Sequence, residues 1–480
     1  MSDEFPSSTS RRCGRSTTRS PTAAVVGLWA VLMLLATGCV TELEADATAG
    51  LTSTTRIPVT TTVESPAADQ KAEGSGPDSA TTTTTPLPAL VDAHLEVVEV
   101  LDGLDAPVAL SFRSGQDEMI FVAQREGTVR RVEIRARSRG RISYRLRSGH
   151  LVDVRDEIDL SPGSTDDDDD DGETSLTMAD RGVRGMAISA DGRRIYLSFT
   201  DTNGTTRIDE WTFGDAQISN RTRRTVLQLD TPLSDVAGNN LAFGPDGFLY
   251  IALGVADSGA TSGTAQDPRT LAGSVLRIDP EPFEDEDYVI PAGNPFADGD
   301  LGAPEVYLYG LHHPTALSWD RATDDLWLTD AGRDRIEEIN LLTAGADVGA
   351  NLGWDVYEGS RLADPDLAAL ADHTPPLFEY DQGVLCKLTG GTVYRGEIEP
   401  LQGVYVYGDA CDQRLYGMVT NQLGEVVEAG PIAEGLEAGP ITALAANAKN
   451  ELYGLSLRHG SILSVQAIES TEDEEDEEDE

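Results

Sequence analysis

The hydrophobic positions beyond Leu90 recur as pairs of short apolar segments, each pair joined by a polar turn. Six stretches show this pattern: Leu110–Gln124, Met186–Phe199, Leu241–Leu253, Ala316–Asp330, Gly390–Asp409 and Thr442–Ser456. Several turns contain Asp-Gly or Asn, which tolerate the positive φ that tight hairpin loops require. The pattern therefore predicts six β-hairpins along the chain.

The spacing of the hairpins, roughly 50 to 80 residues from one to the next, suits four-stranded antiparallel blades with unequal loops. Radial repetition of such blades leaves only short sheet edges exposed. We therefore predict an all-β chain that forms a six-bladed β-propeller over residues 91–468. A β-sandwich would use the same hairpins, but this stretch is long for one.

The N-terminus has the composition of an export signal. Four arginines within residues 11–19 precede the apolar run Ala23–Ala36, which leads through small residues to Cys39. The run is too short to span a bilayer comfortably. We predict a signal peptide over residues 1–38, lipidation of Cys39 and a place on the outer face of the cell membrane. Ordinary signal cleavage, with Cys39 incidental, is the alternative.

Two further segments lack the apolar residues needed for a core. Residues 39–90 are rich in Thr, Ala, Ser and Pro, and are predicted to be a disordered tether ahead of the propeller. Residues 469–480 form an acidic tail, also predicted to be disordered, and Asp166–Asp171 is an unbroken acidic run. The formal net charge is −47, which disfavours nucleic acid as a partner.

Four cysteines are present. If Cys13 leaves with the signal and Cys39 carries lipid, only Cys386 and Cys411 remain. A single pair outside the cytoplasm favours one disulfide, which would add about 3 kcal/mol for a loop of this length. Two unpaired buried thiols are the alternative.

Four blocks of the sequence resemble the glucose/sorbosone dehydrogenase family. They are Arg181–Ala187, Phe243–Gly254, Leu308–Gly359 and Thr389–Gly396. The resemblance covers most of the chain after Val97 and implies a secreted six-bladed propeller. In the subgroup that it matches best, Cys386 and Cys411 are the paired cysteines, which supports the disulfide.

The family's characterised members oxidise aldose sugars with pyrroloquinoline quinone (PQQ). That reaction needs a histidine base, cationic side chains around the cofactor's three carboxylates, and Ca²⁺ bound by oxygen ligands. This chain departs from the pattern at three places. Val236 stands where the family has its catalytic histidine. His312-His313 replaces an Arg-Asn pair, and Pro440–Ala443 carries none of the family's charges there.

The catalytic residue therefore stays unassigned, with Asp235, His312 and His313 as candidates. Asp235 would neighbour the lost histidine, although a turn or capping role explains an Asp there equally well. The two histidines would line the propeller's mouth and bind a metal or an acidic ligand, or would be satisfied structural residues.

An acidic loop is predicted over Asp330–Glu338, after a strand that ends at Thr329. The resemblance implies that Glu337 and Glu338 contribute oxygen ligands to Ca²⁺. A solvated loop in which Arg333 and Arg335 neutralise these acids is the alternative.

Three functions follow. The preferred one is a cell-surface propeller lipoprotein with a degenerate PQQ site that binds a sugar, a glycan or an extracellular protein, as in the hedgehog-interacting relatives. Membrane contact would be through its lipid alone. The alternatives are an active PQQ-dependent aldose sugar dehydrogenase, and a sugar or lactone hydrolase on the same scaffold.

Overall fold

The computed structural model describes residues 87–468 apart from 94, 138–140, 159, 161–180, 214–221, 230–235, 257–262, 285, 334–335, 364–368, 371 and 382–386. The side chains of residues 236–239 and 256 are also outside the description. All described residues belong to one compact unit, Pro58–Glu480. The signal, the tether and the acidic tail predicted above fall almost entirely outside them and stay predictions.

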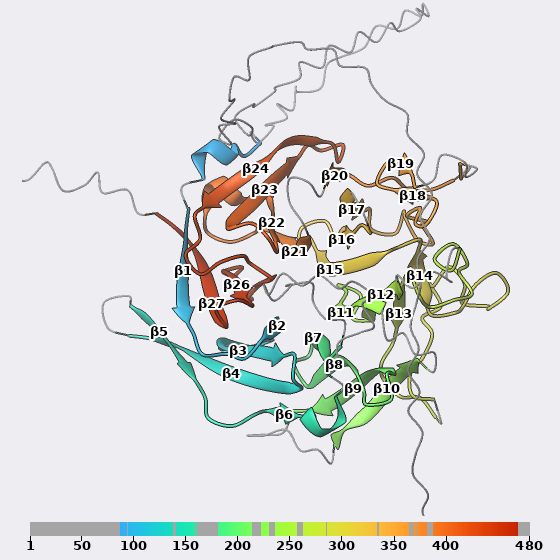
Figure 1. Cartoon of the computed structure of the whole chain (residues 1–480), viewed down its shortest axis with the longest axis horizontal. Helices are drawn as coiled ribbons and strands as arrows, with labels where there is room; N and C mark the ends of the chain where they lie inside the picture. The colour runs from blue at the N-terminus through green and yellow to red at the C-terminus, as the bar shows by residue number, and fades with distance from the viewer. Residues whose placement is uncertain are drawn as a thin grey trace, which may run out of the picture. The chain divides into compact units, whose positions relative to one another are not determined.

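The described chain consists of antiparallel sheets arranged around an axis (Figure 1). The first blade contains β2 (Pro107–Arg113), β3 (Gln116–Gln124), β4 (Thr128–Ala136) and β5 (Ile142–Leu146), with β6 (Val152–Asp153) beside β4. The second contains β7 (Val183–Ile188), β8 (Arg194–Thr200), β9 (Thr206–Thr212) and β10 (Arg224–Leu229). The third contains β11 (Val236–Phe243), β12 (Leu249–Ala256), β13 (Ser274–Ile278) and β14 (Val306–Tyr309).

The other three blades complete the circle. The fourth contains β15 (His313–Trp319), β16 (Leu326–Ala331), β17 (Ile336–Leu342) and β20 (Phe378–Asp381). The fifth contains β21 (Leu388–Val393), β22 (Tyr405–Asp409), β23 (Arg414–Thr420) and β24 (Val426–Glu434). The sixth contains β25 (Ala443–Ala446), β26 (Leu452–Ser456), β27 (Ser461–Ala467) and β1 (Leu95–Leu101). A small hairpin, β18 (Tyr357–Glu358) with β19 (Arg361–Leu362), and three short 3₁₀ helices, η1 (Leu90–Asp92), η3 (Arg155–Glu157) and η5 (Glu399–Leu401), lie between strands.

The six predicted hairpins are confirmed, since each forms the first two strands of a blade. Their turns have the expected backbone, with positive φ at Gly247, Asp324 and Asn450. The predicted acidic loop is shorter than expected. The β16 strand continues to Ala331 and β17 begins at Ile336, so Glu337 and Glu338 lie in a strand. The six-bladed propeller of four-stranded antiparallel blades is likewise confirmed.

The ring closes in two ways. The first strands of the blades, β2, β7, β11, β15, β21 and β25, contact one another in succession and β25 returns to β2. The last blade takes its outer strand from the start of the folded chain, because β1 pairs with β27 from Leu95 opposite Ala467 onward. The two ends of the domain are therefore held in one sheet.

Hydrophobic side chains fill the spaces between neighbouring blades. The second strand of the third blade is apolar on both faces, and Leu249, Ile251 and Leu253 are completely buried. Burying such a side chain fully contributes about 1.5–3 kcal/mol. A blade packed on both sides explains why these strands read as continuous apolar runs in the sequence.

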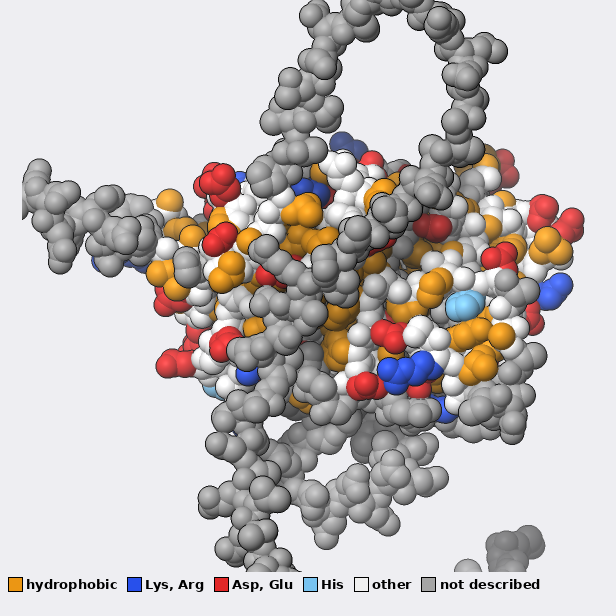
Figure 2. Space-filling model, turned by 90° about the horizontal axis from the view of Figure 1, so that it is seen from above, with side chains coloured by type: hydrophobic (Ala, Val, Ile, Leu, Met, Phe, Trp, Pro, Cys, Tyr) orange, Lys and Arg blue, Asp and Glu red, His pale blue; other side chains and the backbone are white. Residues whose placement is uncertain are grey.

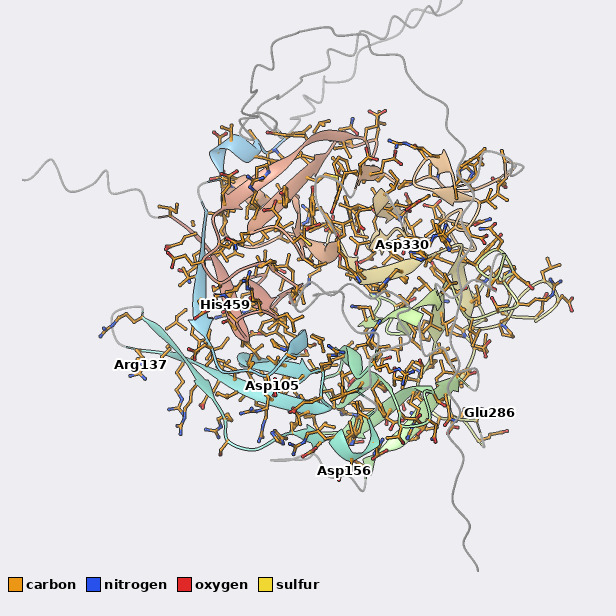
Figure 3. The ribbon with its side chains drawn as sticks, viewed as in Figure 1. Asp105, Arg137, Asp156, Glu286, Asp330 and His459 are labelled. Carbon is orange, nitrogen blue, oxygen red and sulfur yellow. The ribbon has the colours of Figure 1, made fainter. Side chains whose placement is uncertain are left out.

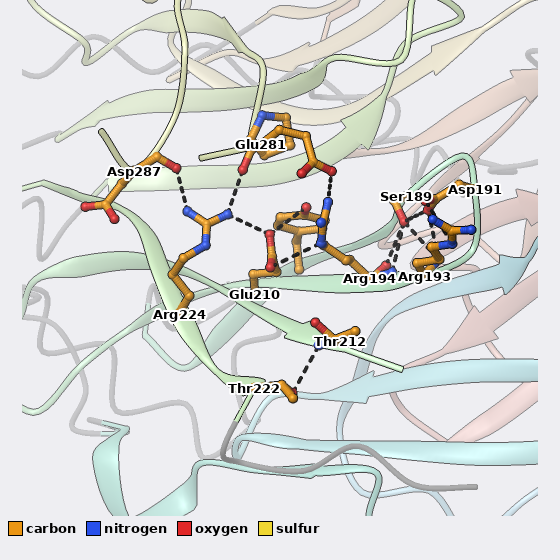
Figure 4. A network of polar contacts seen from close by, with 12 residues as sticks. Ser189, Asp191, Arg193, Arg194, Glu210, Thr212, Thr222, Arg224, Glu281 and Asp287 are labelled. Carbon is orange, nitrogen blue, oxygen red and sulfur yellow. Dashed lines mark hydrogen bonds and ion pairs between the residues drawn. The ribbon is translucent and has the colours of Figure 1, made fainter. Parts of the chain in front are cut away.

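A polar network ties the second blade to the third at the outer edge (Figure 4). Glu210 is buried and accepts hydrogen bonds from the Arg224 guanidinium and the Tyr196 hydroxyl, at 2.7 and 2.8 Å. Its other oxygen lies 3.4 Å from Arg194 Nε. Arg224 also donates to the Pro280 carbonyl oxygen, and Arg194 pairs with Glu281, both beyond β13.

Charged side chains are abundant outside. On the face drawn in Figure 2, Asp and Glu side chains are spread among apolar and uncharged ones, and Lys and Arg are fewer. This agrees with the excess of 83 acidic over 36 basic residues in the chain.

Glu210→Ala is expected to lower the free energy of unfolding by about 3 kcal/mol, because it leaves two guanidinium groups and a tyrosine hydroxyl without their buried acceptor. Glu281→Ala removes the same charge from a carboxylate that is 57% exposed, and should cost less than about 1 kcal/mol. Urea denaturation of both variants measures the difference. Equal losses would contradict a special role for Glu210.

Candidate functional site in the central channel

The first strands of the six blades surround a cavity of about 610 Å³ along the propeller axis. Its wall is mostly apolar along the strands and becomes polar near their ends. Every blade contributes residues to it, so its shape depends on the whole ring.

One end of this channel is cationic. Five basic side chains reach it from the starts of the innermost strands or from the adjoining ends of their neighbours: Arg125, Arg181, Arg184, Lys387 and Arg458. Of the described residues that line the channel, only Asp324 carries a carboxylate, and it lies in the β15–β16 turn at the other end. The cationic end therefore favours negatively charged ligands.

His313 lies among these cations. It is the first residue of β15, and its Nε2 is 3.4 Å from Lys387 Nζ. Burial holds the pKa of His313 well below its usual range, and the positive charges of Lys387 and Arg184 lower it further. The imidazole is therefore neutral near pH 7 and can accept a proton or a hydrogen bond.

His312 has a different environment although it is the next residue. It is 4% exposed and does not line the channel. Its Nδ1 lies 2.8 Å from the Ala331 carbonyl oxygen, and its ring packs 4.4 Å from that of Trp354. Arg333 covers the same indole at 5.4 Å. This packing favours the structural interpretation for His312.

The turn before the two histidines is fixed by close backbone contacts. Gly310 has φ +82°, and a Cβ there would lie 2.3 Å from Asn351 Oδ1. Asp330 then accepts hydrogen bonds from the backbone N–H groups of both His312 and His313. These contacts fix the backbone of both residues, so that His313 lines the channel while His312 packs against Trp354.

The sequence-predicted positions in the other blades add no charge to the described site. Val236 begins β11, opposite Ala256, and Asp235 lies outside the described residues. Thr442 lines the channel and donates to the Leu455 carbonyl oxygen. The cations Arg184 and Lys387, which we did not predict as site residues, come from blades at other positions of the ring.

Glu337 and Glu338 are both buried but point to opposite faces of β17. Glu337 accepts the N–H of Leu388 at 2.8 Å and so connects two blades. Glu338 accepts the N–H of Gly359 at 2.6 Å. Neither lines the channel. Among the described residues, no group of three or more His, Cys, Asp and Glu is arranged to hold a metal ion.

Glu338 and Asp330 form a buried acidic pair on neighbouring strands. Burial and, to a smaller extent, the charge of Asp330 together raise the pKa of Glu338 to about 8. Burial likewise raises the pKa of Asp330 to about 6, against the lowering effect of His312. A cation bound beside this pair would reverse these shifts.

Cys411 lies just beyond β22 and donates its backbone N–H to Asp409. Its predicted partner, Cys386, lies outside the described residues, so the pairing itself stays a prediction. Within the described part of the chain no helix is long and apolar enough to cross a membrane.

A propeller with a ligand-sized, cationic central channel is the class that fold and site define. A family model for "Glucose / Sorbosone dehydrogenase" matches residues 104–456. The chain belongs to the glucose/sorbosone dehydrogenase family, as its sequence blocks predicted.

Individual relatives are distant. The HIPL2 protein of Arabidopsis thaliana is 32% identical over 223 residues, which are 41% of this chain and 31% of that protein. The hedgehog-interacting protein of Mus musculus is 26% identical over 387 residues, 75% of this chain and 50% of that protein. The matches thus span about a third to a half of these relatives.

Solved structures agree on the fold. The PQQ-bound aldose sugar dehydrogenase of Streptomyces coelicolor superposes with a TM-score of 0.58 at 22% identity, and the match covers 79% of this chain and 99% of that one. At this identity the likeness concerns the fold alone.

The buried acidic pair predicts a pH dependence. In EDTA, the free energy of unfolding should fall from pH 6.5 to 7.5, because folded Glu338 keeps its proton up to about pH 8 and the unfolded side chain has lost it. Its contribution to the slope is about −1.3 kcal/mol per pH unit at pH 6.5 and about −1 at pH 7.5. Glu338→Gln should remove that contribution. An unchanged slope in the variant would show that Glu338 is ionised in the folded state.

Proposed function

We propose that this protein is an exported propeller lipoprotein that binds an anionic small molecule, such as a carboxylated sugar, at the cationic end of its channel. The convergence of Arg184, Lys387 and neutral His313 carries the proposal. Charge-assisted hydrogen bonds to carboxylates are strong, and in a partly buried channel they are screened little.

Binding is favoured over sugar oxidation because the family's catalytic and clamping positions hold Val236, His312 and an uncharged Pro440–Ala443 segment. Relatives in the same family include a hedgehog-interacting protein, so the scaffold serves proteins named for binding another protein. A glycan or an extracellular protein that presents a carboxylate to the channel is therefore within the proposal.

PQQ is the second candidate ligand, and the channel fits its charge. The cations from several blades suit a molecule with three carboxylates, and the cavity of about 610 Å³ offers ample room. Arg184 and Lys387 would hold those carboxylates, and PQQ when bound supplies a quinone that accepts hydride. His313, neutral and within the channel, would take the proton from a sugar hydroxyl.

Calcium was predicted at Glu337 and Glu338, which face opposite sides of β17. We propose Asp330 and Glu338 as its ligands instead, since carboxylates buried together are stabilised by a hard divalent cation. No observation favours the hydrolase. Glu337 and Glu338 accept backbone hydrogen bonds away from the channel, and Asp235 lies outside the described residues.

Isothermal titration of the purified protein with PQQ, and with glucuronate and glucose, tests the binding site. Lys387→Ala and Arg184→Ala should each weaken binding of the anions at least about tenfold, since each removes a charged hydrogen-bond partner. Arg321→Ala, at the opposite end of the channel, is the matched control and should change binding little. Equal effects of all three variants, or preference for neutral glucose, would refute the anion site.

Dye reduction by the PQQ-loaded protein with a panel of aldoses separates binding from turnover. A binding protein is expected to give no dye reduction with any of these sugars. Robust turnover that disappears in His313→Ala and persists in His312→Ala would establish the dehydrogenase instead.

A further inference from the structure

One hairpin in the first blade is strongly basic, whereas the chain as a whole is strongly acidic. Residues 128–149 contain eight of the chain's 36 basic residues and a single acid, Glu133. We call the strands β4 and β5, with Arg137, Arg141 and Arg147 at their ends, the arginine ribbon. A net charge near +7 on so short a segment contrasts with −47 for the whole chain.

The ribbon has two different faces. Val132 is completely buried, and Ile134, Tyr144 and Leu146 pack beside it onto the core shared with the last blade. The outward face carries Glu133 opposite Arg145, Arg135 opposite Ser143, and Arg131 near Arg147. Packing of the apolar face explains why the hairpin folds onto the blade, but it does not explain why the outward face carries arginines.

Internal neutralisation of the outward face is limited. Glu133 pairs with both Arg135 and Arg147, at 2.8 and 3.1 Å, and these arginine side chains are still 48% and 45% exposed. Arg137 donates to the Ser143 hydroxyl, and Arg141 and Arg145 are exposed. Several guanidinium groups are thus held close together against their mutual repulsion.

The far end of the ribbon is also apolar. Ile142 is the first residue of β5 and shares the face of Tyr144 and Leu146. Beyond the core, however, it is 51% exposed, and Ala136 across from it is exposed too. Figure 3 shows Arg137 at the outer end of the hairpin, directed away from the body of the propeller. The tip of the hairpin therefore presents an exposed apolar side chain on one face and arginines on the other, which is the amphipathic arrangement of a segment that lies in a membrane interface.

We propose that the arginine ribbon docks the propeller onto an anionic lipid surface, with Ile142 at the headgroup level and the guanidinium groups on lipid phosphates. This rests on the proposed location at the outer face of a membrane. The ribbon contacts β1, the strand with which the fold begins after the predicted lipid tether. A body of such negative charge is repelled by anionic lipid, so the local cations set which side faces the membrane.

A soluble polyanion would use the same arginines but has no need of an exposed isoleucine. The ligand chemistry favoured here is therefore phosphate headgroups in a bilayer, with binding confined to a Debye length of about 8–10 Å at physiological salt.

Vesicle co-sedimentation tests the proposal. The probe is the full chain with Cys39→Ala, which prevents lipid attachment, and the readout is its partitioning to phosphatidylglycerol-containing vesicles relative to pure phosphatidylcholine. Replacing Arg135, Arg137, Arg141 and Arg145 by Gln should reduce this ratio at least roughly tenfold. Ile142→Ser should reduce it by a smaller factor.

The matched control replaces four exposed arginines elsewhere, Arg155, Arg193, Arg269 and Arg361, by Gln, which changes the net charge equally. It should retain the wild-type ratio, and thermal unfolding verifies that each variant is folded.

Equal loss in the control and ribbon variants, or no preference of the parent chain for anionic vesicles, would overturn the proposal. Retention on heparin that is insensitive to Ile142→Ser, without vesicle binding, would assign the ribbon to a soluble polyanion. A negative vesicle result would not bear on ligand binding in the channel, because that binding is measured separately by isothermal titration.

Discussion

The mutual contact of six innermost strands is the constraint on which the rest of the structure depends. Each strand packs against the next, and the circle is completed because β1 pairs with β27. No blade alone surrounds a cavity, so the channel and the side chains that meet in it exist only when the ring is closed. Residues separated by more than 200 positions, such as Arg184 and Lys387, become neighbours of one imidazole by this route.

Electrostatics in the channel follow from that geometry. Cations brought together at one end lower the pKa of His313 in the same direction as its burial does. On the neighbouring strands β16 and β17, Asp330 and Glu338 are buried together and hold protons more strongly than usual. Two neighbouring parts of one blade therefore have opposite electrostatics. The surroundings of His313 favour anions, whereas Asp330 and Glu338 favour a cation or a proton.

Local chemistry made the hairpins predictable from the sequence, because turn residues and apolar alternation act over a few positions. The pairing of Leu95 with Ala467 has no local signature, and we did not predict it. Glu337 and Glu338 were treated as a pair because their segment was interpreted as a loop. Recognising the strand would have separated them, since consecutive residues in a strand face opposite ways.

The cationic site was missed for a related reason. The family's clamping positions are altered at His312-His313 and near Thr442, and from those positions alone a degraded site was expected. Other cations converge on the channel instead. Arg184 did leave a signal, because it lies within the block Arg181–Ala187 that resembles the family. Lys387 gave none until the fold placed it beside His313. Similarly, the overall charge of −47 obscured the arginine ribbon.

The most direct test of the account is the titration of the His313 imidazole followed by NMR, with and without citrate or PQQ. A neutral imidazole among cations should titrate well below the usual 6.5, and an anion in the channel should raise its pKa by offsetting Lys387 and Arg184. A His313 pKa near 6.5 that does not respond to either anion would contradict the account.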